Sequence, residues 1–273
     1  MSGADVIDSF NRAAYSRRKT VRSYSELPIG LFEAERVILE RLRPELEGRK
    51  LLDIGVGGGR TTPAILSISS DYTAIDYSAG MAERVRNRWP EIEVYWLDVR
   101  KMKPFATDTF DFALFSFNGL DLMNHRDRLQ AMNEIHRVLK PGGIFVFSSH
   151  NRDGDAAKPA WRRRNVRLSV QFSKECIKTI LWSPRHLWRR RFEAHEEEYA
   201  ILNDCSLHYS ALTYYISLGA QKNQLESVGY TAVEAFDANG TRVEDDSTSL
   251  WIHYLARKPG ATGAEKPPSG PYA

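Results

Sequence analysis

Cysteine is scarce in this chain of 273 residues, and long hydrophobic runs are missing. The two cysteines, Cys176 and Cys205, lie far apart and form no C-x-x-C motif, so the sequence predicts neither a disulfide framework nor a zinc site. We expect no metal elsewhere. No stretch approaches the roughly 18 apolar residues of a membrane span, and residues 1–20 lack the apolar core and cleavage pattern of a signal peptide. These absences favour a cytoplasmic protein.

Four glycines fall within the five residues 55–59. The short apolar run Leu51–Ile54 stops at Gly55, and three more glycines follow before Arg60. An apolar run that ends at glycine and leads into a helical segment, here residues 61–67, is typical of a strand, a tight turn and a helix. Glycines leave room for a ligand against the backbone and allow positive φ angles. The turn is therefore predicted to bind a nucleotide-like ligand.

Asp53 narrows the choice of ligand. In dinucleotide-binding folds the strand before the glycines is normally apolar, and a pyrophosphate rests on the following helix N-terminus. A carboxylate two residues before Gly55 would repel a phosphate and, directly or through water, attract a cationic amino group. The pattern Asp53-x-Gly55-x-Gly57-x-Gly59 resembles motif I of the class I S-adenosylmethionine-dependent methyltransferases. The cofactor of that family carries an ammonium, a sulfonium and no phosphate.

Acidic residues also end the next two predicted strands. Asp76 closes the run 72–76, and an acid at this spacing accepts hydrogen bonds from ribose hydroxyls of either an NAD or an adenosyl ligand. Asp98 follows the run 92–97, where the resemblance implies an acid that accepts from the adenine amine. A turn aspartate or helix cap is the alternative. Met81, in the helix after Asp76, either packs inside or lies against adenine.

The fourth strand is expected at residues 110–117, which are nearly continuously apolar, as in a strand buried on both faces. The resemblance implies that its end, at Phe117 and Asn118, meets the methionine part of the cofactor and the acceptor. No Asn-Pro-Pro-Tyr signature follows it, which weighs against the amino-methyltransferases of DNA adenine and protein glutamine. A helix over 126–139 then leads through Leu139-Lys-Pro-Gly-Gly143, which resembles the family's post-helix turn.

Strand and helix alternate five times in about 120 residues, which predicts an α/β, doubly wound, Rossmann-like parallel sheet with its ligand at the carboxyl ends of the strands. The resemblance implies seven strands, the last antiparallel. Before the first strand, the helical pattern that opens at Leu31 is expected to stop at Pro44. We divide the chain into an N-terminal helical cap (1–30), a methyltransferase core (31–150 and 217–257), an inserted basic α+β lid or substrate cap (151–216) and a disordered tail (258–273).

The candidate site residues follow from these positions. The resemblance implies a cofactor site comprising Asp53, Gly55, Val56, Gly57, Gly59, Arg60, Asp76, Tyr77, Met81, Asp98, Val99, Arg100, Phe115, Phe117 and Asn118. The candidate acceptor-binding residues are Tyr24, Asn118, His208, Tyr214 and Tyr215, although packing accounts equally well for the tyrosines. His150, directly after the predicted fifth strand 144–148, is the candidate general base. A hydrogen-bonded structural histidine is the alternative.

Positive charge is concentrated in the insert. Residues 151–191 hold 12 Lys or Arg and 3 Asp or Glu, a net charge of +9, whereas the whole chain carries +3. Glutamates at 193 and 196–198 follow and would neutralise part of this segment, so a solvated lid is one interpretation. The others are attraction of an acidic acceptor, contact with an anionic membrane surface, and RNA binding. RNA ranks last because no RNA-binding module accompanies the arginines.

Three functions remain open from the sequence. The leading hypothesis is an S-adenosylmethionine-dependent enzyme that methylates an oxygen or nitrogen of a small-molecule metabolite or natural product. In-line methyl transfer needs alignment and exclusion of water, and needs a base only if the nucleophile arrives protonated. The second is a membrane-associated lipid or RNA methyltransferase that uses the basic segment. The third is a nicotinamide-dependent dehydrogenase, which Asp53 disfavours.

Overall fold

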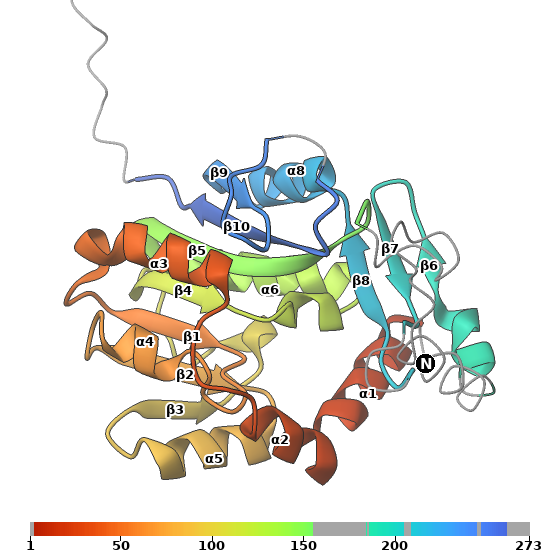
Figure 1. The fold of residues 1–273 in the computed structure, drawn as a ribbon, viewed down its shortest axis with the longest axis horizontal. Coiled ribbons are helices and arrows are strands. Elements are labelled where there is room, and N and C mark those ends of the chain that lie inside the picture. The colour runs from red at the N-terminus through yellow and green to blue at the C-terminus, as the bar shows by residue number, and fades with distance from the viewer. Residues whose placement is uncertain (1–2, 155–183, 185, 205–208, 245–246, 261–273) are drawn as a thin grey trace, which may run out of the picture.

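A computed structural model of the chain describes residues 3–154, 184, 186–204, 209–244 and 247–260 (Figure 1). Two helices, α1 (Gly3–Tyr15) and α2 (Arg18–Ser25), occupy most of the expected N-terminal cap. The five strands with predicted ranges recur with changes of boundary: β1 (Leu51–Ile54), β2 (Tyr72–Asp76), β3 (Glu93–Trp96), β4 (Phe110–Phe115) and β5 (Leu139–Asn151). Two further strands of the core are β9 (Thr231–Phe236) and β10 (Trp251–Arg257).

The strand pairing confirms the predicted fold class. Strands β1 to β5 are parallel and lie in the order β3-β2-β1-β4-β5. The last strand, β10, is antiparallel to β5 and pairs on its other side with β9. Parallel strands joined by helices bring their carboxyl ends to one edge, where ligands bind in open α/β sheets.

Helices cover both faces of the sheet (Figure 1). The helices α3 (Glu33–Leu46), α4 (Thr62–Leu66) and α5 (Ala79–Arg88) contribute to one apolar cluster, and α6 (His125–Val138) and α8 (Leu218–Val228) contribute to the other. Successive residues of β5 alternate between the two clusters: Ile144 and Val146 face the first, Phe145 and Phe147 the second. A strand buried on both faces needs apolar residues at every position.

The helix α3 runs through Pro44 to Leu46, so the predicted stop at Pro44 is wrong. Proline removes one backbone donor, which costs least near the end of a helix. The apolar face continues past it, because Leu42 and Leu46 are both buried. At the other end, the Glu35 carboxylate accepts a hydrogen bond from the backbone amide of Phe32 at 2.9 Å.

The strand β5 is longer than predicted at both ends. Leu139 already pairs with Phe110, and the register shifts before Phe112 pairs with Ile144. Gly142, with φ of +80°, lies in this irregularity, so the Pro-Gly-Gly turn is a bulge within the strand. The predicted disordered tail is ordered at its first residue, because the Lys258 ammonium donates to the Leu139 carbonyl at 2.7 Å. The rest of the predicted disordered tail, residues 261–273, lies outside the described residues.

The sheet contains ten strands in the described residues, the seven of the core and three more. The additional strands come from the insert: β6 (Ala194–His195), β7 (Tyr199–Leu202) and β8 (Thr213–Ile216). Strands β7 and β8 pair antiparallel, so the insert has a strand pair of its own. Its last residues pair in parallel with the end of β5, at His150 and Asn151. The described part of the insert therefore extends the core sheet, and its role as a lid stays a prediction.

In the described part of the chain, no helix combines the length and the apolar character that crossing a membrane requires.

Candidate functional site

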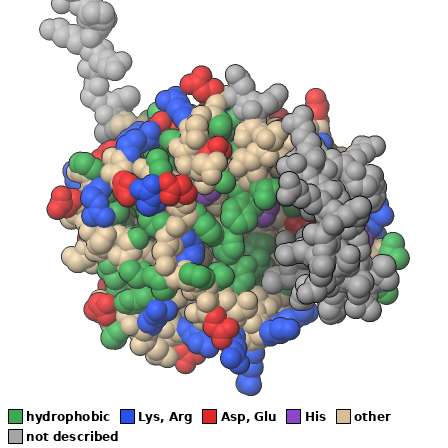
Figure 2. Space-filling model, viewed as in Figure 1, with side chains coloured by type: hydrophobic (Ala, Val, Ile, Leu, Met, Phe, Trp, Pro, Cys, Tyr) green, Lys and Arg blue, Asp and Glu red, His purple; other side chains and the backbone are tan. Residues whose placement is uncertain are grey.

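A cavity lies at the carboxyl ends of β1 to β4, under α1 and α2. In the view of Figure 2 the surface is hollowed, and hydrophobic side chains gather in the hollow. The cavity wall combines the glycine turn, the ends of three further strands and one side of α1. Its position agrees with the sheet edge at which the sequence placed the predicted site.

The glycine turn forms the cavity floor in a conformation that favours glycine. Gly55 and Gly57 have φ angles of +66° and +56°, which side chains with a Cβ rarely adopt. A Cβ at Gly58 would lie 2.5 Å from the carbonyl oxygen of Tyr24, so α2 rests directly on the turn. Gly59 packs against the Trp89 ring and does not line the cavity.

Asp53 lies beneath the turn, outside the cavity wall. Its side chain is 1% exposed, and one carboxylate oxygen accepts hydrogen bonds from the Thr61 hydroxyl at 2.6 Å and the Tyr72 hydroxyl at 2.9 Å. Burial raises the pKa of Asp53 to about 6, against the effect of these two hydrogen bonds. Asp53 is therefore separated from the cavity by the turn, and its attraction of an ammonium, directly or through water, stays a prediction. Asp53 ties the turn to α4 and β2.

Asp76 lines the cavity at the end of β2. Its carboxylate accepts hydrogen bonds from the backbone amides of Gly57 at 2.9 Å and Ser78 at 2.8 Å. Burial raises the pKa of Asp76 to about 6, although both backbone amides favour the charged form. Each oxygen keeps a lone pair for a further donor, so the side chain can accept from the two hydroxyls of a ribose.

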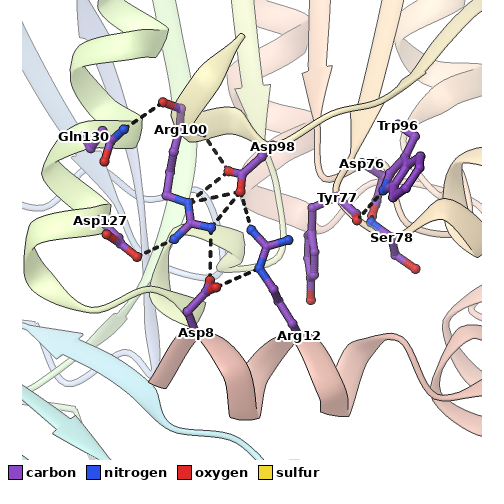
Figure 3. Close-up of polar contacts among 10 residues, drawn as sticks. All are labelled: Asp8, Arg12, Asp76, Tyr77, Ser78, Trp96, Asp98, Arg100, Asp127 and Gln130. Carbon is purple, nitrogen blue, oxygen red and sulfur yellow. Dashed lines mark hydrogen bonds and ion pairs between the residues drawn. The ribbon is translucent and has the colours of Figure 1, made fainter. Parts of the chain in front are cut away.

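Two guanidinium groups surround Asp98 at the end of β3 (Figure 3). Arg100 binds the Asp98 carboxylate at 2.7 Å, and Arg12 of α1 reaches the same carboxylate from the other side. Burial alone would raise the pKa of Asp98, but the hydrogen bonds and charge of Arg100, together with Arg12, lower it to about 2. Asp8 of α1 and Asp127 of α6 complete the network through Arg100.

The network changes the interpretation of Asp98. Both of its oxygens already accept hydrogen bonds from Arg100, and one also accepts from Arg12. Acceptance from an adenine amine would compete with these donors. The Arg12 guanidinium also lies over the Tyr77 ring, 5.4 Å from its centre. The network therefore holds α1 across this end of the cavity.

A buried ion pair fixes the opposite side. Arg60 binds the carboxylate of Glu35 through two hydrogen bonds of 2.8 Å, and it donates to the Ser116 hydroxyl at 2.5 Å. The side chain of Glu35 is 1% exposed and that of Arg60 is 11% exposed. A bidentate guanidinium–carboxylate pair has a fixed geometry, so this contact locks the start of α3 onto the glycine turn. Arg60 also lies over the Phe32 ring at 4.0 Å.

Aromatic rings surround the end of β4. Phe117 lies 5.9 Å from Tyr24, 5.3 Å from Phe32 and 5.5 Å from Trp251, measured between ring centres. Phe117 and Asn118 have φ angles of +55° and +58°, an uncommon conformation outside glycine that costs energy. The strand therefore stops at Phe115, two residues before the predicted end, and the chain turns its aromatic side chain towards the cavity.

Of the predicted acceptor and catalytic residues that the structure describes, one lines the cavity. Tyr24 lines the cavity, whereas Asn118, His150, Tyr214 and Tyr215 do not. Tyr214 is fully buried and stacks on Tyr199, and the Tyr215 hydroxyl donates to Asp204 at 2.6 Å, so strand packing accounts for both. His208 lies outside the described residues, as does most of the basic segment 151–191.

Most predicted cofactor residues come together in the wall. These are Gly55, Val56, Gly57, Arg60, Asp76, Tyr77, Met81, Asp98, Val99, Arg100, Phe115 and Phe117. Sequence reasoning missed one side of α1, which adds Asp8, Asn11, Arg12 and Tyr15. Their spacing of one to four residues is typical of one helix face. A polar stripe along residues 8–15 is thus the pattern from which the sequence could have predicted this side of the cavity.

A family model described as "Methyltransferase domain" matches residues 51–143. A demethylmenaquinone methyltransferase of Clavibacter sepedonicus is 31% identical over 138 residues, which cover 50% of this chain and 53% of that protein. The chain spans about half the length of the curated relatives it matches.

Solved structures share the fold. An S-adenosylmethionine-dependent methyltransferase from Mesorhizobium loti has a TM-score of 0.57 at 21% identity, with 82% of this chain and 98% of that chain covered. The Burkholderia thailandensis 1,6-didemethyltoxoflavin-N1-methyltransferase, solved with 1,6-didemethyltoxoflavin and S-adenosylhomocysteine, has a TM-score of 0.56 at 15% identity, with coverage of 94% and 88%. Residues 51–143 thus match a methyltransferase domain, and the fold of the chain is similar to that of solved S-adenosylmethionine-dependent methyltransferases.

Proposed function

We propose that this protein is an S-adenosylmethionine-dependent methyltransferase whose acceptor is an oxygen or nitrogen nucleophile of a small-molecule metabolite or natural product. The observation that carries the proposal is the cavity at the carboxyl ends of β1 to β4, where bare glycine backbone and the Asp76 carboxylate share one wall. A carboxylate at this place accepts from ribose hydroxyls. The comparisons do not favour the lipid or RNA alternative.

The residues of the cavity fit an adenosyl compound without phosphate. Ile75, Met81, Leu97 and Val99 supply apolar contacts near Asp76, as a nucleobase would require. The arginines of the wall are already paired with acids: Arg60 with Glu35, and Arg12 and Arg100 with Asp98. A pyrophosphate would have to compete for these cations, whereas a neutral adenosyl group would not.

S-adenosylmethionine, when bound, supplies an electrophilic methyl group on a sulfonium. The chain contributes alignment and exclusion of water, which such a displacement requires. The helices α1 and α2 cover the cavity, and Tyr24 and Phe117 provide flat apolar surface beside the glycine turn. Aromatic walls suit a planar or apolar acceptor, so we place the acceptor near the end of β4.

Two measurements test the proposal. Calorimetry should show binding of S-adenosylhomocysteine and none of NAD at equal concentration. Labelled methyl transfer should then identify acceptors in a panel of phenols, heterocyclic amines and carboxylic acids, with anionic vesicles and RNA as further acceptors. A protein that gives no heat with millimolar S-adenosylhomocysteine, or that prefers NAD, would overturn the assignment. Transfer only to lipid or RNA would overturn the acceptor class alone.

A further inference from the structure

A buried charged cluster lies behind the end of β5, outside the cavity wall. Asp121, in the short 3-10 helix η2 (Gly119–Leu122), and Arg128 of α6 are both fully buried, and an Arg128 nitrogen lies 2.5 Å from Asp121 Oδ1. Arg128 also donates to Gln221 at 2.6 Å and Gln224 at 3.1 Å. A buried ion pair is often no more stabilising than apolar side chains of the same volume, so stability alone does not account for this one.

Asp121 fixes the orientation and the tautomer of His150. Its Oδ2 accepts two hydrogen bonds from this one residue, from the backbone amide and from the ring Nδ1, both at 2.6 Å. An ionised carboxylate only accepts hydrogen bonds, so Nδ1 carries the proton and Nε2 of the neutral ring carries the lone pair. The side chain of His150 is 15% exposed, whereas that of Asp121 is 0% exposed. The outer end of the ring is thus the basic nitrogen.

The basic nitrogen of His150 faces the loop that borders the cavity. In this tautomer the side-chain nitrogen of Asn118 donates to Nε2 at 3.4 Å, a contact that the proton of an acceptor would replace, and Asn118 stands between Phe117 and Gly119, which both line the cavity. Asn118 is 3% exposed, and its side-chain oxygen has no hydrogen-bond partner among the described residues. A buried amide oxygen without a donor is costly and would be satisfied by a donor group of a bound molecule other than the proton that reacts.

We propose that Asp121, held by Arg128, is a positioning residue that prepares His150 to accept the proton of an O–H or N–H acceptor beside Asn118. This inference rests on the proposed function. The Nε2 lone pair takes the acceptor proton while the acceptor oxygen or nitrogen bonds to the methyl carbon. The carbon–sulfur bond breaks, its electron pair stays on sulfur, and the proton leaves from His150 to solvent. The acceptor class is therefore a protonated nucleophile, such as a phenol or a ring N–H.

Few other charges in the described chain face this histidine. The Tyr215 ring of β8 lies 5.0 Å from the His150 ring, and its hydroxyl donates to Asp204. The Trp251 ring of β10 lies at 6.1 Å and carries no charge. Asp121, with Arg128 behind it, is thus the charged group in direct hydrogen-bond contact with the ring. An imidazolium formed at His150 would be stabilised mainly by Asp121.

The first test needs no activity. Nuclear magnetic resonance of protein labelled with ¹⁵N-histidine at neutral pH reports which ring nitrogen carries the proton. We expect His150 to be protonated at Nδ1 and bare at Nε2, a tautomer that disappears from the spectrum in His150→Gln. A His150 ring protonated at Nε2 overturns the inference, and it does so whether or not the protein binds S-adenosylhomocysteine.

The second test separates positioning from structural support. With an identified acceptor, His150→Gln should lower kcat roughly 100-fold. Asp121→Asn should lower kcat roughly tenfold and move the acid limb of the pH–rate profile to lower pH, because the imidazolium loses its anionic partner. The matched control is Asp111→Asn, which removes a carboxylate paired with Lys140 at the other end of β4.

The outcomes distinguish this inference from the proposed function. If Asp121→Asn melts at a lower temperature while its kcat and pH profile match those of Asp111→Asn, Asp121 only supports the structure and the inference fails. If His150→Gln transfers methyl groups at the wild-type rate, the inference fails while the methyltransferase assignment stands. If the wild-type protein binds no S-adenosylhomocysteine, the proposed function fails and the tautomer measurement alone decides how His150 is held.

Discussion

Replacement of Asp53 by asparagine should change how the stability of the ligand-free protein depends on pH. Burial raises the pKa of Asp53 from 3.8 to about 6, so the folded protein binds this proton more tightly than the unfolded chain does. The stabilising contribution is therefore complete below about pH 4 and is lost as the pH rises through about 6. A shift of about two pKa units corresponds to about 3 kcal/mol.

Asparagine preserves the hydrogen bonds while it removes the charge. The hydroxyls of Thr61 and Tyr72 both donate to a single oxygen of Asp53, and the amide oxygen of asparagine can accept both. The unfolding free energy of Asp53→Asn minus that of the wild type should therefore increase by about 3 kcal/mol as the pH rises from 4 to 8. Asp53→Ala should instead lose stability at every pH, by about 1–3 kcal/mol for each hydroxyl left unpaired.

Urea unfolding of the ligand-free proteins at one-unit steps from pH 4 to pH 8 measures this difference. Burial lowers the pKa of His136 and His253, so these groups lower stability as the pH falls, opposite to Asp53. They titrate in both proteins and cancel in the comparison. Asp98, whose pKa is lowered to about 2, titrates below this window. A difference between wild type and Asp53→Asn that stays constant across the range would refute the reasoning.

Three further predictions concern the cavity. Burial raises the pKa of Asp76 to about 6, and hydrogen bonds from ribose hydroxyls favour its ionised form. Calorimetry should therefore show an affinity for S-adenosylhomocysteine that rises with pH through this value, and Asp76→Asn should lower the affinity roughly 10- to 100-fold. An affinity independent of pH would contradict this. Arg12→Ala frees α1 from the acids beneath it, so stopped-flow dissociation of S-adenosylhomocysteine should accelerate roughly three- to tenfold. Arg22→Ala, which removes an exposed pair within α2, should leave the rate unchanged, and equal rates in all three proteins would show that α1 is not held. Gly58→Ala should lower the melting temperature, because the added Cβ would lie 2.5 Å from a backbone atom of α2. The control Gly219→Ala in α8 meets open space and should raise the unfolding free energy by about 0.5–1 kcal/mol. Similar melting temperatures for the two variants would argue against contact between α2 and the turn.

The sequence predicted the fold because its signals are local. Apolar runs that end in glycine or an acid place each strand of the parallel half, and the alternation of strand and helix sets the topology. Boundaries failed where a distant partner decided them. The strand β5 extends to Asn151 because β10 and β8 both pair with its end, and no periodicity within residues 139–151 reveals those partners.

Only part of the site could be predicted from the sequence, again because distant partners decide the rest. Gly57 and Asp76 lie in a strand–turn–helix pattern that fixes their surroundings, and both line the cavity. The direction of Asp53 depends on hydroxyls 8 and 19 residues later in the chain, so its burial did not follow from the motif. The contact of Arg12 with Asp98 spans 86 residues. Sequence spacing gives no measure of such contacts.

The shared hydrogen bonding of β5 has a practical consequence for engineering. His150 pairs with Tyr215 of β8 on one side and with Trp251 of β10 on the other, so a single position connects both flanking strands. A chimera that receives the insert of a relative would also need the end of β5, the η2 turn and the start of β10 from that same relative. Grafting at residue 151 alone would leave the new insert to pair with strand ends that come from a different protein.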